Sequence, residues 1–170
     1  LLPMLCNMAD KDLWVNIPHL ASDDYIRKLA RLIRFGSNGS EPYAAPVENP
    51  IYPPLNSDLR IFIEYSNEIW AGGYSFPQGD WAEEQATSLG LSKEQFNARR
   101  FVRIWQIFQE EFSDEAESRL VKVAAVFTGA QWYTEPFLNE MASFGNSLDP
   151  VISFKKGNGI QDWVYEKASE

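Results

Sequence analysis

Apolar residues recur along this chain with two different spacings, and each spacing predicts a different kind of element. Short, near-continuous apolar runs predict four strands of a buried parallel sheet, at residues 13–17, 59–65, 120–127 and 151–154. Apolar positions repeated every three or four residues predict three helices, at residues 23–35, from residue 92 onward, and at residues 136–144. Strands and helices alternate along the chain, which favours an α/β fold with helices packed on a parallel sheet.

Residue types at the helix ends support these boundaries. Ser22 is a good N-cap for the first predicted helix, and Gly36 is suited to end it. Ser92 and Gln95 have the spacing of a capping box, in which each side chain bonds the backbone of the other. We therefore expect a long helix to begin at about residue 93.

Two stretches between these elements predict loops. Residues 37–58 are rich in Pro, Asn, Gly and Ser, and residues 71–80 contain a Gly-Gly pair and a proline. A loop as long as the first is uncommon inside a compact domain and is usually functional or mobile.

The most informative segment is residues 61–70, where an apolar run stops at Asn67 and Glu68. In strand-helix barrels the catalytic groups lie where such strands end. A carboxyl can protonate a glycosidic oxygen, an amide can bond a sugar hydroxyl, and the flanking Tyr65 and Trp70 offer apolar faces. The competing interpretation of Glu68 is an exposed carboxylate at the start of a helix, where negative charge is favourable.

Length and composition bound the size of the domain. With 170 residues, 45% of them hydrophobic, the chain can bury one ordinary core. It is shorter than the roughly 250 residues of a complete eight-stranded barrel. The first residue is Leu1, so we expect a processed product or a piece of a larger protein.

Charge and composition exclude several classes of partner. The net charge of −9 gives no basic patch for nucleic acid and disfavours anionic membranes. No apolar run reaches the roughly 20 residues of a membrane span. Cys6 is the single cysteine and His19 the single histidine, so we expect neither a metal site nor another cofactor. A neutral oligo- or polysaccharide remains a compatible ligand.

Two segments resemble a known family. Residues 14–19 with residues 21–25, and residues 65–70, are similar to the central part of retaining glycoside hydrolases of the large clan with (β/α)8 barrels. More narrowly, they resemble bacterial and marine proteins described as cellulose-binding or glycosyl-hydrolase-like. The resemblance covers about residues 4–141. It implies that residues 1–170 form a single TIM-type barrel-like domain or a fragment of one, with about half of the barrel present.

The resemblance also implies roles for individual residues. Glu68 corresponds to the general acid/base at the end of the fourth barrel strand, and Asn67 to the residue that bonds the substrate 2-hydroxyl. A retaining enzyme needs a second carboxylate as nucleophile, about 5 to 5.5 Å away. The family places it after the seventh strand, whereas this chain ends near the sixth. Glu166 is the candidate within the chain, although it follows the strand at 151–154 too closely for another helix and strand to intervene. Further substrate contacts are expected at strand ends, from Asn16, His19, Tyr65, Trp70 and Trp132.

Three functions follow as alternatives. The first is a hydrolase that cleaves O-glycosidic bonds of a neutral polysaccharide by retention. The second is a non-catalytic carbohydrate-binding protein that keeps the cleft without a nucleophile. The third is a structural module that associates with itself through exposed sheet edges. A parent enzyme that degrades polysaccharides would be secreted or periplasmic, whereas the residues themselves indicate no compartment.

Overall fold

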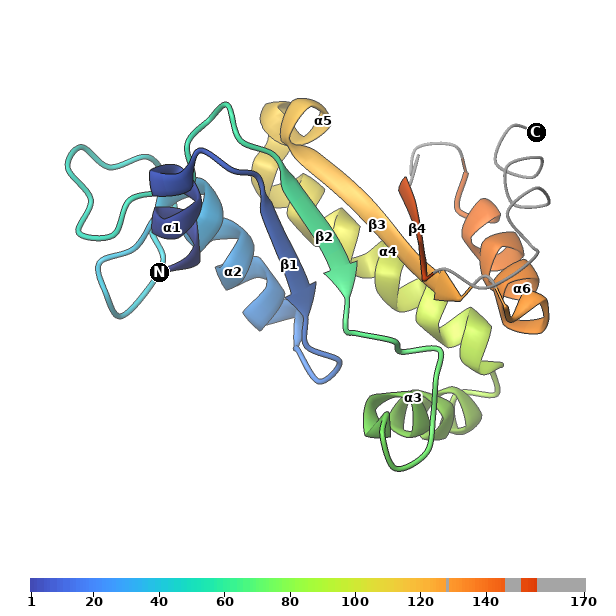
Figure 1. Ribbon diagram of the computed structural model, residues 1–170. Helices are drawn as coiled ribbons and strands as arrows, with labels where there is room; N and C mark the ends of the chain where they lie inside the picture. Colours follow the sequence, from blue (N-terminus) through green and yellow to red (C-terminus); the bar gives the residue numbers. More distant parts are fainter. Residues whose placement is uncertain (128, 146–150, 156–170) are drawn as a thin grey trace. The chain divides into compact units, whose positions relative to one another are not determined.

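The computed structural model describes residues 1–127, 129–145 and 151–155, and it is a mixed α/β fold with a parallel sheet (Figure 1). The elements in chain order are α1 Leu2–Ala9, β1 Leu13–Ile17, α2 Asp23–Phe35, β2 Ile61–Tyr65, α3 Pro77–Ser88, α4 Lys93–Phe112, the 3-10 turn η1 Ser113–Glu115, α5 Ala116–Arg119, β3 Leu120–Phe127, α6 Gln131–Ala142 and β4 Val151–Lys155. The α/β prediction is confirmed at this level.

The sheet follows the order of the chain, β1-β2-β3-β4. β3 and β4 pair in parallel, with Val123 opposite Val151 and Phe127 opposite Lys155. All four strands lie where the apolar runs predicted them. The two predicted N-caps are also confirmed. Tyr25 N–H donates to Ser22 Oγ at 3.2 Å. Ser92 and Gln95 each accept a bond from the other's backbone, at 3.2 and 3.1 Å.

The chain divides into two compact units, which we describe separately. The first unit comprises Leu1–Glu64 and Arg103–Lys122. The second comprises Tyr65–Val102 and the described part of Val123–Glu170. β2, β3 and α4 each run from one unit into the other. The expectation of one domain over residues 1–170 stays a prediction.

The apolar spacing did not predict two of the helices, α1 and α3. α1 is apolar on several sides, with Leu5 and Met8 62% and 84% exposed, so no single face repeats. α3 buries only small residues, Gly79, Ala82 and Ala86, and therefore shows little hydrophobic contrast. Its first residues were wrongly included in the predicted loop 71–80.

The last helix, α6, was misplaced at its start. It begins at Gln131 rather than at Pro136, which lies inside it. Proline is commonest in the first turn of a helix, whereas Pro136 lies in the second turn of α6. Thr134 Oγ1 donates to the carbonyl oxygen of Phe127 at 3.2 Å, which connects α6 to the last residue of β3.

In the first unit, one face of the strand pair β1 and β2 is buried and the other is partly open. Ile61 and Ile63 are 0% exposed. Both side chains therefore lie on the buried face. The partly open face carries Trp14 instead, whose ring stacks on Phe62 at 5.3 Å and whose Nε1 donates to Glu64 at 2.9 Å.

Two buried side chains connect β2 and the segment before it to the helices of the first unit. Trp105 of α4 is 0% exposed, and its Nε1 donates to the carbonyl oxygen of Ile63 at 3.2 Å. Arg119 is 5% exposed and donates to the carbonyl oxygens of Leu55, Asn56 and Leu59 at 3.3, 2.8 and 3.2 Å. These bonds satisfy backbone acceptors in the segment that leads into β2, which buried loops require.

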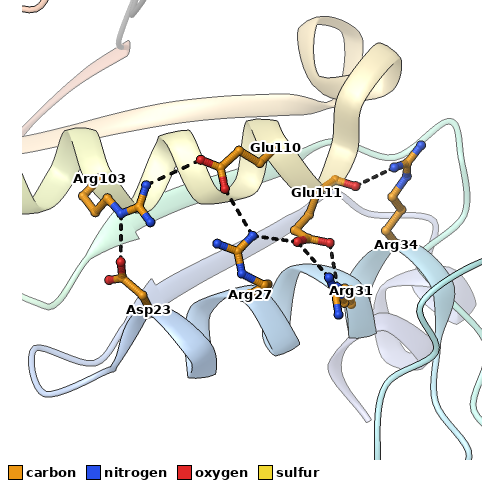
Figure 2. A network of polar contacts seen from close by, with 7 residues as sticks. All are labelled: Asp23, Arg27, Arg31, Arg34, Arg103, Glu110 and Glu111. Atoms are coloured by element: carbon orange, nitrogen blue, oxygen red, sulfur yellow. Dashed lines mark hydrogen bonds and ion pairs between the residues drawn. The ribbon is translucent and has the colours of Figure 1, made fainter.

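An ion-pair network joins α2 to the last half of α4 (Figure 2). Glu111 is its most buried carboxylate, with a side chain 11% exposed, and it accepts from Arg27 at 2.8 Å and Arg31 at 2.7 Å. Arg103 extends the network to Asp23 at 2.8 Å. Burial raises the pKa of Glu111, but the hydrogen bonds from Arg31 and Arg27 outweigh it and leave that pKa below its ordinary value.

We expect Glu111→Gln to lower the free energy of unfolding by about 1–3 kcal/mol near neutral pH, because two guanidinium groups lose a charged acceptor. The depressed pKa means that the folded state favours the carboxylate. This contribution is therefore full above the ordinary value of 4.5 and is lost as pH falls through the lower folded-state pKa.

Urea unfolding of wild type and Glu111→Gln, from neutral to acidic pH, measures the difference in the free energy of unfolding. Glu117→Gln is the matched control, because Glu117 is an exposed carboxylate of the neighbouring helix α5. A difference between Glu111→Gln and wild type that stays constant down to strongly acidic pH would contradict the assignment.

Candidate functional site

The turn that follows β2 has an unusual backbone. Ser66 and Glu68 both have positive φ, 59° and 49°, although neither is a glycine. Both are buried, with exposed fractions of 7% and 8%. The other positive-φ residues other than glycine in the described chain are Asp10, Asn49 and Ser113, and all three are exposed. Two strained, buried residues within three positions mark this turn as a candidate site.

Asn67 and Glu68 differ in their access to solvent. Asn67 is exposed, and its backbone oxygen accepts from Gln78 Nε2 at 2.7 Å. Glu68 is buried, and its backbone oxygen accepts from the N–H of Ala71 at 2.9 Å. The structure therefore places both residues directly after β2, as the sequence indicated, and Glu68 is the more enclosed of the two.

Two tryptophans of the second unit show different degrees of exposure. Trp70 is half-buried and stacks on Phe127 of β3, with ring centroids 4.9 Å apart and planes 12° apart. Trp132, at the start of α6, is 72% exposed and meets Tyr133 edge-on at 6.1 Å. Trp132 thus offers an open indole face, while Trp70 has one face covered.

Tyr65 does not lie where a sugar contact requires it. It is 1% exposed and packs edge-on against Phe101 of α4 at 5.4 Å. Burial raises its pKa to about 12, partly offset by the guanidinium of Arg100, which lies over the ring at 5.9 Å. Its burial leaves no open ring face, so we place Tyr65 in the core rather than among the sugar contacts.

A buried polar pair in the second unit was not predicted. Asn97 of α4 is 0% exposed, and its Nδ2 donates to the hydroxyl of Tyr133 at 2.8 Å. Burial raises the pKa of Tyr133, against the opposing effect of this bond. Asn97 Oδ1 has no hydrogen-bond partner within the described part of the chain. The burial of Asn97 could have been predicted from the sequence, because Asn97 lies on the same helix face as Phe101, Ile104 and Phe108.

His19 and Asn16 belong to the first unit. Asn16 is exposed on β1, and His19 is half-buried in the turn that follows, where Ala21 N–H donates to the carbonyl oxygen of Pro18 at 2.9 Å. Their roles as substrate contacts stay predictions. Glu166, the candidate nucleophile, lies outside the described residues.

The first unit also contains a pocket of about 290 Å³. None of the predicted site residues lines it. Its walls come from α1, α2 and the loop after α2, through Leu1, Pro3, Met4, Leu32, Gly36, Ser37, Gly39, Tyr52 and Pro53. Within the described ranges, no three His, Cys, Asp or Glu side chains gather as a metal site would require. None of the helices described is both long and apolar enough to cross a membrane.

Comparison with known proteins finds no family model, no curated protein and no solved structure that matches this chain. The resemblance to retaining glycoside hydrolases therefore depends on the two sequence segments alone. What the structure adds is the conformation of the turn that contains Asn67 and Glu68.

We expect Ser66→Gly to raise the free energy of unfolding by about 0.5–1 kcal/mol, because glycine adopts a positive φ without strain. Ser66→Val should lower it by more than that, because a β-branched residue is least tolerated there. Thermal or urea unfolding measures both. Ser57, exposed in the loop before β2, provides the control pair Ser57→Gly and Ser57→Val. Equal effects at the two positions would contradict a strained turn at Ser66.

Proposed function

We propose that this chain acts on O-glycosidic bonds of a neutral polysaccharide, with Glu68 as general acid/base. One observation carries the proposal: Glu68 is 8% exposed in a positive-φ turn at the end of β2. Buried carboxylates in strained backbone are costly, and such features cluster at functional sites. Asn67, the residue before Glu68, is exposed and available to bond a sugar hydroxyl.

The proposed chemistry needs two carboxyl groups. Protonated Glu68 gives its proton to the glycosidic oxygen while a second carboxylate attacks the anomeric carbon and forms a glycosyl-enzyme. Glu68, now ionised, then removes a proton from water, which releases the sugar with retention. Glu166 stays the candidate for the second carboxylate within this chain.

The aromatic residues of the second unit support a sugar as the ligand. Sugar rings have an apolar face that packs on flat aromatic side chains, while their hydroxyls need polar partners. Trp132 has an open face, and the Trp70–Phe127 stack lies in the same unit as Glu68. Both predicted tryptophans therefore remain candidate substrate contacts.

We further propose that the sheet is part of a TIM-type (β/α)8 barrel, about half of which is present. Strand order equal to chain order supports this, because barrels add each strand beside the previous one, whereas doubly wound sheets reverse direction. The partly open face that carries Trp14, Phe62 and Glu64 would then point toward the barrel interior.

A non-catalytic carbohydrate-binding protein is the second candidate. It is favoured by the exposure of Trp132, an open stacking surface that needs no nucleophile to bind a sugar. Self-association through the edges of the sheet is compatible with either function and stays a proposal.

The test uses two aryl β-cellobiosides that differ in their leaving group, one nitrophenyl and one dinitrophenyl. We expect wild-type protein to hydrolyse both with retention. Glu68→Gln should reduce turnover of the nitrophenyl substrate by about 10²- to 10⁴-fold. Its first step on the dinitrophenyl substrate should be affected much less, because that leaving group departs without a proton. Anomeric configuration by NMR and initial rates provide the measurements.

Glu84→Gln is the control, because Glu84 is an exposed carboxylate on α3. Equal turnover by wild type and Glu68→Gln would refute the role of Glu68. Cello-oligosaccharide binding without turnover, lost in Trp132→Ala, would support the non-catalytic candidate instead. If the protein neither bound nor hydrolysed these sugars, both candidate functions would be rejected.

A further inference from the structure

The backbone after the Asn-Glu pair is held by side chains from two helices. The carboxylate of Asp80 on α3 accepts from the N–H of Gly73 at 2.9 and 3.0 Å through its two oxygens. Gln78, also on α3, donates to the carbonyl oxygen of Asn67. Lys93, the first residue of α4, donates from Nζ to the carbonyl oxygen of Ala71 at 2.8 Å. All of these groups belong to the second unit.

Gly79 allows α3 to approach this backbone closely. A Cβ atom at position 79 would lie 1.5 Å from the carbonyl oxygen of Ala71 and 3.2 Å from that of Ile69. Both obstacles are backbone atoms, which cannot rotate away as a flexible side chain can. Any larger residue at position 79 must therefore displace the segment directly after Glu68.

Lys93 occupies an unfavourable place for a surface lysine. Burial lowers the pKa of its ammonium, although Glu83, Asp80 and Glu94 act in the opposite direction. A lysine head group normally stays in water while only its stem is buried. Here the ammonium bonds a backbone oxygen three residues after Glu68, and Ala71 in turn bonds the backbone of Glu68.

We propose that Lys93 and Gly79 are positioning residues for Glu68, acting through Ala71. This inference rests on the proposed function, because it gives the turn a role in glycoside chemistry. Ser66 and Glu68 hold positive φ, a conformation that persists only where the surroundings over-determine it. Lys93 fixes the segment after the turn by a charged hydrogen bond, and Gly79 fixes it by close packing.

The first experiment compares wild type, Lys93→Met and Lys93→Arg by hydrogen exchange. Methionine keeps the length of the side chain but removes the donor. We expect exchange of the Ala71 and Gly73 amides, read in a peptide covering residues 66–76, to rise about tenfold in Lys93→Met. Arginine should restore slow exchange because it still donates. Lys11→Met, at an exposed lysine of the first unit, is the control and should match wild type.

The second experiment measures hydrolysis of nitrophenyl β-cellobioside by the same proteins and by Gly79→Ala. We expect kcat to fall about 10- to 100-fold in Lys93→Met and Gly79→Ala, with KM changed much less, because misplacement impairs the reacting group rather than binding. Lys93→Arg should recover most of kcat. Thr87→Ala, at an exposed position of α3, is the control for the added helix former.

The outcomes separate this inference from the proposed function. Unchanged exchange of the Ala71 and Gly73 amides in Lys93→Met would overturn the role of Lys93, whatever the protein hydrolyses. Faster exchange with wild-type kcat would show that Lys93 holds the turn without positioning Glu68, which also overturns the proposal. Wild-type protein that neither hydrolyses nor binds cello-oligosaccharides would reject the proposed function and the catalytic part of this inference. The exchange rates would then still decide whether Lys93 holds the turn.

Discussion

One-sided burial of the strands is the constraint on which the rest of the structure depends. In β1 buried and exposed residues alternate strictly, and in β2 Ile61, Ile63 and Tyr65 are buried while the residues between them are partly open. Because side chains alternate between faces, a shift of one residue would turn every buried residue outward. The register is therefore fixed, and with it the point at which the chain leaves β2. The turn with Ser66 and Glu68 begins at that point, so the packing of the strand determines where the candidate site lies.

The sequence predicted elements wherever local signals and packing agree. Four apolar runs became strands, and Ser22 and Ser92 cap the helices that they were expected to cap. Prediction failed where no apolar face repeats, as in α1, or where packing uses residues without strong hydrophobic character. α3 approaches the backbone through Gly79 and otherwise buries two alanines, which no apolar pattern distinguishes from a loop. The predicted start of α6 was too late, because its proline lies in the second turn, where proline is unusual.

The candidate site was predicted by residue type but not by conformation. The end of an apolar run at Asn67 and Glu68 located the turn correctly, yet nothing in the residue types signals positive φ at serine and glutamate. The burial of Tyr65 could have been predicted, because it shares strand parity with Ile61 and Ile63. The burial of the Asn97 side chain could likewise have been predicted from helix periodicity. The supports from Gln78, Asp80 and Lys93 could not be found, because they join residues 7 to 22 positions apart across a loop and two helices.

Several conformations and contacts that cost free energy in the second unit gather around the loop after β2. Two positive-φ residues cost of order 1–3 kcal/mol each, and a half-buried ammonium adds a desolvation penalty. The other positive-φ residues besides glycine in the described chain are exposed, and buried Arg119 donates to three backbone oxygens. A turn needed only for chain reversal would be cheaper with glycine at the two positive-φ positions. Retaining Ser66 and Glu68 there, and holding the segment with Lys93 and Gly79, is consistent with a side chain that is needed at position 68 for its chemistry.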